Sequence, residues 1–208
     1  GRPSVSALSL SKVCVTRLCH DLAGAVGAVS NSLELLSEDG GADAETLRLA
    51  ESGAGILVAR LSFFRAAYGN EGPLSGEEAA RQLTENYLRS MENSVVRFTC
   101  EWNVDSEMPL FAFRLMLLAV QSAAESLVRG GRLKIEAKAG EKRLHVCGEG
   151  RKVLLDPETE EVLAGRRTEA SPKQAGALFL ISVLQEQGWK LDFRRNETGI
   201  DFVLSAKE

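Results

Sequence analysis

His20 is one of only two histidines in this chain, and it stands directly before an acid in the run Arg17-Leu18-Cys19-His20-Asp21-Leu22. Apolar and small residues recur around it at the spacing of a helical seam, which places His20 on the opposite face, toward solvent. Gly24 and Gly27 follow at i+4 and i+7 and therefore share that face. Each glycine inside a helix costs about 1 kcal/mol relative to alanine. A face kept free of side chains would let another protein come close to the imidazole. The alternative is that the glycines allow tight helix packing and His20 is an ordinary surface residue, and spacing alone leaves both open.

Two further segments extend the pattern around His20-Asp21. They read Asn-Ser-Leu-Glu-Leu-Leu at 31–36 and Leu-Ser-Phe-Phe-Arg-Ala-Ala-Tyr-Gly at 61–69. The first, together with His20-Asp21, resembles the phosphoacceptor helix of bacterial two-component proteins. With Cys19-His20-Asp21-Leu22 and the following Gly-Ala-Val, the whole set resembles the ChpT-type histidine phosphotransferases of alphaproteobacteria. The similarity continues weakly to the C-terminus, and its specific part is the first seventy positions.

The resemblance implies that His20 is a phosphoacceptor. A histidine is mostly neutral at pH 7, and a neutral imidazole can attack a phosphoryl group held on a partner's aspartate. The partner receiver domain would supply Mg²⁺ and the electrostatic stabilisation, so this chain needs no cofactor of its own. Asp21 resembles the acid that follows the histidine in sensor kinases, where it orients the ring or accepts its proton. A plain helix-surface charge is the alternative for Asp21.

Two arginines and an asparagine complete the candidate site. Arg17 lies one turn before His20 on the same side of the helix. In an antiparallel hairpin that turns near Gly40, Arg60 lies at the height of position 20. The two cations could steady phosphoryl oxygens or meet an acidic receiver cleft, and solvated arginines are the alternative. Asn31, also on the His20 face, could hydrogen-bond a docked partner or simply be exposed.

The elements that must position these residues are two long helices, expected at about 5–37 and 43–68. The second begins with Asp43 as its cap and ends before the breaker Gly69-Asn70-Glu71-Gly72-Pro73. The seam of the first helix is expected at Val15, Leu18, Leu22, Ala25, Val29, Ser32 and Leu36. The second helix carries two apolar stripes, which is more apolar surface than one partner helix covers. We therefore expect an antiparallel hairpin that forms a four-helix bundle in a homodimer.

The remaining sequence predicts a second domain, with the boundary between 1–70 and 71–208. Helices are expected at 76–91, 109–128 and 172–187, and strands at 95–102, 132–139, 142–147, 189–194 and 199–205. The stretch after residue 147 is expected to be loop-rich, with Asp156-Pro157 as a turn. This order predicts an α/β sandwich, and the whole chain an α+β protein. The order is similar to that of the ATP-binding domain of histidine kinases.

The residues that such a kinase uses to bind ATP are missing. Ala123 stands where the magnesium-binding asparagine is expected, and alanine cannot ligate a metal. Gly148 replaces the adenine-binding aspartate, and Lys152 replaces the second glycine of the same loop. The segment 171–176 lacks the run of glycines that approaches phosphates. We therefore expect the kinase-like fold without the nucleotide site.

Composition narrows the function classes. The net charge of −4 gives no electrostatic support for binding nucleic acid. No apolar run reaches the ~20 residues of a membrane span and no signal-peptide pattern is visible, so a cytoplasmic protein is expected. The four cysteines show no paired or metal-site spacing, so free thiols and no bound metal are expected, with His145 as a strand residue.

Three hypotheses about function follow from these patterns and from the resemblance. The first is a dimeric phosphotransferase that takes a phosphoryl group from the receiver domain of a hybrid histidine kinase and passes it through His20 to response regulators. The second is a non-catalytic, kinase-like dimer that binds and sequesters a response regulator. The third, an ATP-dependent kinase, is disfavoured by the residues missing from the nucleotide site.

Overall fold

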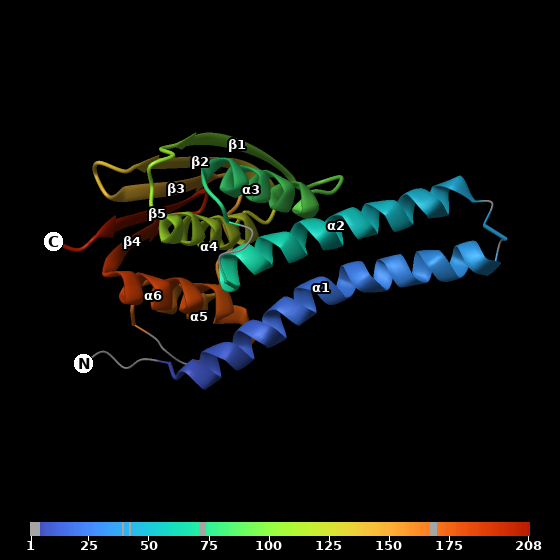
Figure 1. The fold of residues 1–208 in the computed structure, drawn as a ribbon, viewed down its shortest axis with the longest axis horizontal. Helices are drawn as coiled ribbons and strands as arrows, with labels where there is room; N and C mark the ends of the chain where they lie inside the picture. The colour runs from blue at the N-terminus through green and yellow to red at the C-terminus, as the bar shows by residue number, and fades with distance from the viewer. Residues whose placement is uncertain (1–4, 39, 42, 71–73, 167–169) are drawn as a thin grey trace.

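A long helical hairpin opens the fold. The computed structural model describes residues 5–38, 40–41, 43–70, 74–166 and 170–208. Helix α1 (Ala7–Glu38) and helix α2 (Ala44–Tyr68) run side by side, and their connected ends project well beyond the rest of the molecule (Figure 1). Asp43 caps α2 as predicted, because its side chain accepts a hydrogen bond from the backbone N–H of Glu45. The helices approach closely at Gly53, where an added Cβ would lie 3.1 Å from Val29.

The buried face of α1 differs from the predicted seam near its N-terminus. Ala25 and Ser32 are buried as expected, but Val15 is 61% exposed, and Val13 and Cys14 are buried instead. The cause is a change of partner along the helix. The first turns of α1 pack on α6 and η1, in the helix layer of the sandwich, as well as on α2, so the buried stripe rotates toward that layer.

The second part of the chain is an α/β sandwich with a five-stranded mixed sheet. The strands are β1 (Arg97–Val104), β2 (Gly130–Lys138), β3 (Arg143–Glu149), β4 (Trp189–Arg195) and β5 (Gly199–Ala206). They lie in the order β1-β2-β3-β5-β4, with β1 parallel to β2 and the other neighbours antiparallel. The α+β fold class and the hairpin between β4 and β5 are therefore confirmed.

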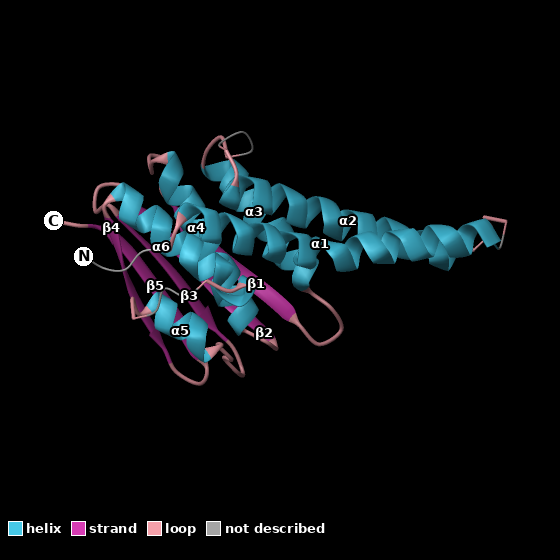
Figure 2. Cartoon of the chain, turned by 90° about the horizontal axis from the view of Figure 1, so that it is seen from below, coloured by secondary structure: helices cyan, strands magenta, loops and turns pink. Residues whose placement is uncertain are grey.

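Helices cover one face of this sheet (Figure 2). They are α3 (Glu77–Met91), α4 (Leu110–Ser126) and α6 (Ala175–Gln187), and the short 3₁₀ helix η1 (Pro172–Gln174) leads into α6. Alternate strand residues point toward them and are fully buried, including Leu133, Ile135, Val146, Phe202 and Leu204. The residues between them face the other side, which these helices leave open.

One predicted loop is a helix. The stretch after β3 contains α5 (Pro157–Leu163), and Asp156 caps it by accepting a hydrogen bond from the N–H of Thr159. The Asp-Pro pair is therefore a helix start and not a turn. Proline suits the first helical position because its missing N–H is not needed there. A helix start was therefore also compatible with this sequence.

The hairpin and the sandwich share one hydrophobic core. Phe63, Phe64 and Ala67 at the end of α2 are buried in the same cluster as α4 and α6. Phe63 stacks on Tyr87 of α3 with ring centroids 3.9 Å apart. The predicted boundary between residues 70 and 71 follows the end of α2, and 71–73 lie outside the described residues. Within the described part of the chain, no helix has the length and apolar character that crossing a membrane requires.

Candidate functional site

His20 lies on the solvent side of α1, close to the point where the hairpin leaves the sandwich. Its side chain is 85% exposed, which agrees with its predicted place opposite the seam. Its Nδ1 is 3.6 Å from Oδ1 of Asp21, longer than a hydrogen bond. The carboxylate thus lies beside the Nδ1 edge of the ring, and the rest of the imidazole is open to an approaching molecule.

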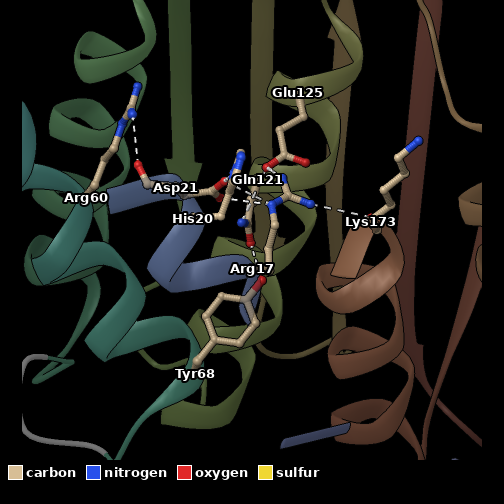
Figure 3. A network of polar contacts seen from close by, with 8 residues as sticks. All are labelled: Arg17, His20, Asp21, Arg60, Tyr68, Gln121, Glu125 and Lys173. Atoms are coloured by element: carbon tan, nitrogen blue, oxygen red, sulfur yellow. Dashed lines mark hydrogen bonds and ion pairs between the residues drawn. The ribbon is translucent and has the colours of Figure 1, made fainter. Parts of the chain in front are cut away.

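Arg17 does not stand free beside the imidazole, as the spacing had suggested. Its side chain is only 20% exposed, and its guanidinium points toward Glu125 and Lys173 (Figure 3). Nε donates to both carboxylate oxygens of Asp21 at 3.1 and 3.0 Å, and Nη2 donates to Glu125 of α4 at 2.5 Å. Nη1 lies 3.5 Å from the carbonyl oxygen of Lys173. Arg17 therefore fixes Asp21 and ties α1 to α4 and η1.

Arg60 occupies the height that the hairpin geometry predicts. Its Nη1 lies 3.4 Å from the carbonyl oxygen of Asp21, so it reaches the backbone of α1 beside His20. Its other nitrogens contact Ser90 at the end of α3, with Nη2 donating to the carbonyl oxygen at 3.1 Å. Arg60 is half-buried and connects α1, α2 and α3 at the level of the histidine.

Two polar residues of α4 extend the network to the end of α2. The hydroxyl of Tyr68 donates to Oε1 of Gln121 at 2.5 Å, and Nε2 of Gln121 lies 3.5 Å from Glu125 (Figure 3). Sequence reasoning did not find Gln121, Glu125 or Tyr68 as parts of this site. A signal was present, because Glu125 is the one carboxylate of a largely apolar helix, and a carboxylate that becomes buried there needs a charged partner from elsewhere in the fold. The sequence alone did not predict that this partner is Arg17.

The electrostatics of the network favour the charge of Arg17 and disfavour that of Glu125. Burial alone would lower the pKa of Arg17, but the carboxylates of Glu125 and Asp21 outweigh it and hold that pKa above its ordinary value. Burial raises the pKa of Glu125, and the positive charge of Arg17 opposes that rise. Burial, followed by the nearby Glu125 charge, also raises the pKa of Tyr68. Arg17 is thus a permanent cation, and Tyr68 keeps its proton for Gln121.

The helix surface that follows His20 has two positions without side chains, Gly24 and Gly27. A Cβ built on Gly24 or on Gly27 meets no atom within 4 Å, so neither glycine is required by packing within the chain. Asn31 is exposed further along α1. The surface around these three positions is available to another molecule.

A small cleft lies between α1, α4 and the segment that leads into α6. It holds about 220 Å³ and is lined by Arg17, Glu125, Asp156 and Lys173, among others. Sites for small molecules usually hold about 300–1,000 Å³. A side chain at Gly148 would meet Ile200 at 3.0 Å and Leu127 at 3.1 Å, so an aspartate cannot be accommodated there without rearrangement.

Comparison with known proteins gives a consistent result. Residues 78–199 match the family model of the histidine phosphotransferase C-terminal domain. The protein phosphotransferase ChpT of Brucella abortus (strain 2308) is 30% identical over 212 residues, which cover 98% of each chain. A solved structure described as a bacterial phosphotransferase superposes with a TM-score of 0.83 at 26% identity, covering 98% of this chain and 99% of that one. The family model spans more than half of the chain and the Brucella relative nearly all of it, so the chain belongs to the ChpT-type histidine phosphotransferases.

Proposed function

We propose that this protein relays a phosphoryl group between receiver domains through His20. The observation that carries the proposal is an imidazole 85% exposed on a helix that is held by α2 and by the sandwich. Because Nδ1 lies beside Asp21, Nε2 is the nitrogen left for reaction. Its lone pair attacks the phosphorus of an aspartyl phosphate, the bond from phosphorus to the carboxylate oxygen breaks, and the donor aspartate is restored. An acceptor aspartate then attacks the phosphohistidine in the same way.

The surrounding residues orient the imidazole and do not bind the phosphoryl group. Asp21 is held by two hydrogen bonds from Arg17, so its carboxylate stays beside Nδ1 and can stabilise the proton that the ring carries there after reaction. Arg60 holds the backbone of the same turn. The receiver supplies Mg²⁺ and the charge stabilisation of the transfer, and the chain itself contributes a rigid and accessible nucleophile.

The protein receives its phosphoryl group from another protein and not from ATP. Ala123 offers no metal ligand, the neighbourhood of Gly148 is closed by Leu127 and Ile200, and the cleft of about 220 Å³ is small for a nucleotide. Arg17 and Glu125 line this cleft and are paired with each other across it. The resemblance to ChpT-type proteins favours a hybrid histidine kinase as donor and response regulators as acceptors.

The working form is a homodimer built through the hairpin. Large apolar side chains along α1 and α2 are exposed in the single chain: Val26, Leu33, Leu35, Leu47, Leu49, Val58 and Leu61. Surface of this extent on a monomer marks an interaction site. A second hairpin packed around a two-fold axis would complete a four-helix bundle and cover much of it.

Phosphotransfer from a labelled receiver tests the function. The wild-type protein and His145→Ala should take up phosphate from a phosphorylated hybrid-kinase receiver, and His20→Ala should take up none. The side chain of His20 is 85% exposed, so circular dichroism of this variant should be unchanged. Binding of the receiver without labelling of the wild-type protein would instead favour the second reading, a protein that sequesters a response regulator.

A further inference from the structure

The open face of the sheet carries a cluster that the phosphorelay does not use. His145 and Cys147 are two residues apart on β3, and both point away from the helices because strand side chains alternate. Asp201 on β5 pairs with Cys147 in the antiparallel register and points to the same side. The three side chains therefore meet near the middle of the sheet, on the face opposite the helix layer.

The three ligand atoms lie close together. Nε2 of His145 is 2.6 Å from Oδ1 of Asp201, and the thiol of Cys147 is hydrogen-bonded to the same carboxylate. All three lie within 4.8 Å of one another. Zn²⁺ binds such atoms at about 2.0–2.3 Å in a tetrahedron, which places the ligand atoms about 3.3–3.8 Å apart. Binding therefore requires Nε2 and Oδ1 to move apart from 2.6 Å, and ligand atoms separated by up to 4.8 Å to move together.

We propose that His145, Cys147 and Asp201 form a binding site for Zn²⁺, with a fourth position open to solvent. One nitrogen, one sulfur and one oxygen ligand suit Zn²⁺, whereas Mg²⁺ and Ca²⁺ prefer oxygen ligands alone. The side chains of His145 and Asp201 are 31% and 44% exposed, so a metal ion reaches them without local unfolding. The open position accepts water.

Binding exchanges protons for the metal. Burial and the hydrogen bond to Asp201 raise the pKa of Cys147 to about 11, so the free protein holds a thiol there. Zn²⁺ forms a bond to the thiolate, and the thiol proton leaves to solvent. The proton that Nε2 shares with Asp201 also leaves this nitrogen. The imidazole then binds through the Nε2 lone pair as the tautomer with its proton on Nδ1, while Asp201 exchanges its hydrogen bonds for a bond to the metal.

The neighbouring charges permit a cation at this place. Lys134 on β2 lies beside Cys147, but its ammonium group is 3.1 Å from the carboxylate of Glu136. Arg194 on β4 lies beside Asp201, and its Nε is 3.5 Å from Asp192. Each flanking cation thus has an acid two residues away on its own strand, which offsets its repulsion of a metal ion.

The sequence did not reveal this cluster because two of its members are too close for a standard metal motif. His145 and Cys147 share a strand, and the third ligand becomes a neighbour only through the pairing of β3 with β5. The cluster also lies on the far side of the sheet from α1. Metal binding is therefore expected to leave phosphotransfer through His20 unaffected, which separates this proposal from the proposed function.

Zinc titration of the reduced, metal-free protein tests the proposal, with a chromophoric chelator as competitor. The titration is done in a Cys19→Ser background, because the thiol of Cys19 is exposed and could bind Zn²⁺ non-specifically. One Zn²⁺ should bind per chain. Cys147→Ser and Asp201→Asn should each weaken binding by at least about a hundredfold, because even the residues behind metal ligands are worth 10–100-fold.

Three controls accompany the titration. Cys100→Ser, at a half-buried cysteine on β1, should bind Zn²⁺ like the parent. Co²⁺ in place of Zn²⁺ should give a thiolate charge-transfer band in the near ultraviolet, which is lost in Cys147→Ser. Metal-free thermal unfolding will show that the variants fold. Equal Zn²⁺ affinity in the parent and folded Cys147→Ser, or no binding by the parent at micromolar Zn²⁺, would overturn the site and show a hydrogen-bonded cluster only.

Discussion

Removal of the ion pair between Arg17 and Glu125 should loosen the hairpin from the sandwich. The experiment is a double-mutant cycle with Arg17→Met, Glu125→Gln and the double variant. Methionine keeps much of the apolar stem of Arg17, and glutamine keeps the shape of Glu125 while removing its charge. The cycle isolates the pair from the bonds that Arg17 makes with Asp21 and Lys173, because those are lost equally in both Arg17 variants.

The expected coupling free energy follows from the burial of the two side chains. Exposed ion pairs contribute about 0–1 kcal/mol, whereas removing one partner of a fully buried pair costs about 3–5 kcal/mol. The side chains here are 20% and 34% exposed at 2.5 Å, which is intermediate. We expect a coupling free energy of about 1–2 kcal/mol. Arg17→Met alone should cost more than Glu125→Gln alone, since it also leaves the Asp21 carboxylate without its partner.

Urea unfolding at one fixed protein concentration provides the assay. Trp102 and Trp189 lie in the sandwich and report its unfolding by fluorescence. High salt serves as an internal check, because at about 1 M the Debye length falls to ~3 Å and an exposed pair would be screened, whereas a half-buried pair is screened less.

Additive effects of the two substitutions on the free energy of unfolding would refute the coupling of Arg17 with Glu125. A coupling free energy below about 0.5 kcal/mol, the usual limit for independent sites, would mean that the contact does not join the two parts of the chain. The same variants should slow phosphotransfer if Arg17 positions Asp21 beside His20. Full transfer rates in a folded Arg17→Met protein would remove that positioning role.

Three further predictions concern the partner surfaces and the closed cleft. Gly24→Leu and Gly27→Leu should preserve or raise the melting temperature, because both Cβ positions are open. The same variants should slow phosphotransfer at least about tenfold, or ~1.4 kcal/mol in the barrier. Unchanged transfer would mean that the receiver docks elsewhere. Val58→Asp, at a side chain 63% exposed in the single chain, should convert a dimer to a folded monomer in light scattering, and a monomeric wild-type protein would contradict the bundle. Calorimetry with Mg-ATP should show no binding up to millimolar ligand, whereas saturable micromolar binding would revive the kinase reading.

The element order could be predicted from the sequence because most elements carry their own local signals. The apolar periodicity of α1 and α2, the cap at Asp43 and the hairpin turn at Asn196 act within a few residues of where they stand. The exposure of His20 followed from the same periodicity. Asp156-Pro157 was misread because an aspartate before a proline suits both a turn and a helix start, and only packing of α5 on the helix layer decides between them.

The polar network of the site could not be predicted in this way. Whether Arg17 points to solvent or inward depends on Glu125, which is far away in the sequence and comes near only when α1 docks on α4. The misplaced seam at Val15 has the same origin, because the first turns of α1 bury the face that meets α6 and η1. Helical periodicity predicts which faces of a helix are apolar, but it does not predict which other element packs on each face.

The docking of α1 on residues far along the chain has a consequence for the order of folding. During synthesis α1 and α2 leave the ribosome before Glu125, Lys173 and the apolar residues of α6 that hold the first turns of α1 in place. Contacts of such long sequence separation form late and slow folding. His20 therefore acquires its final orientation only when the C-terminal third of the chain has been made, so incomplete or proteolysed chains should be poor competitors for phosphorylated receivers.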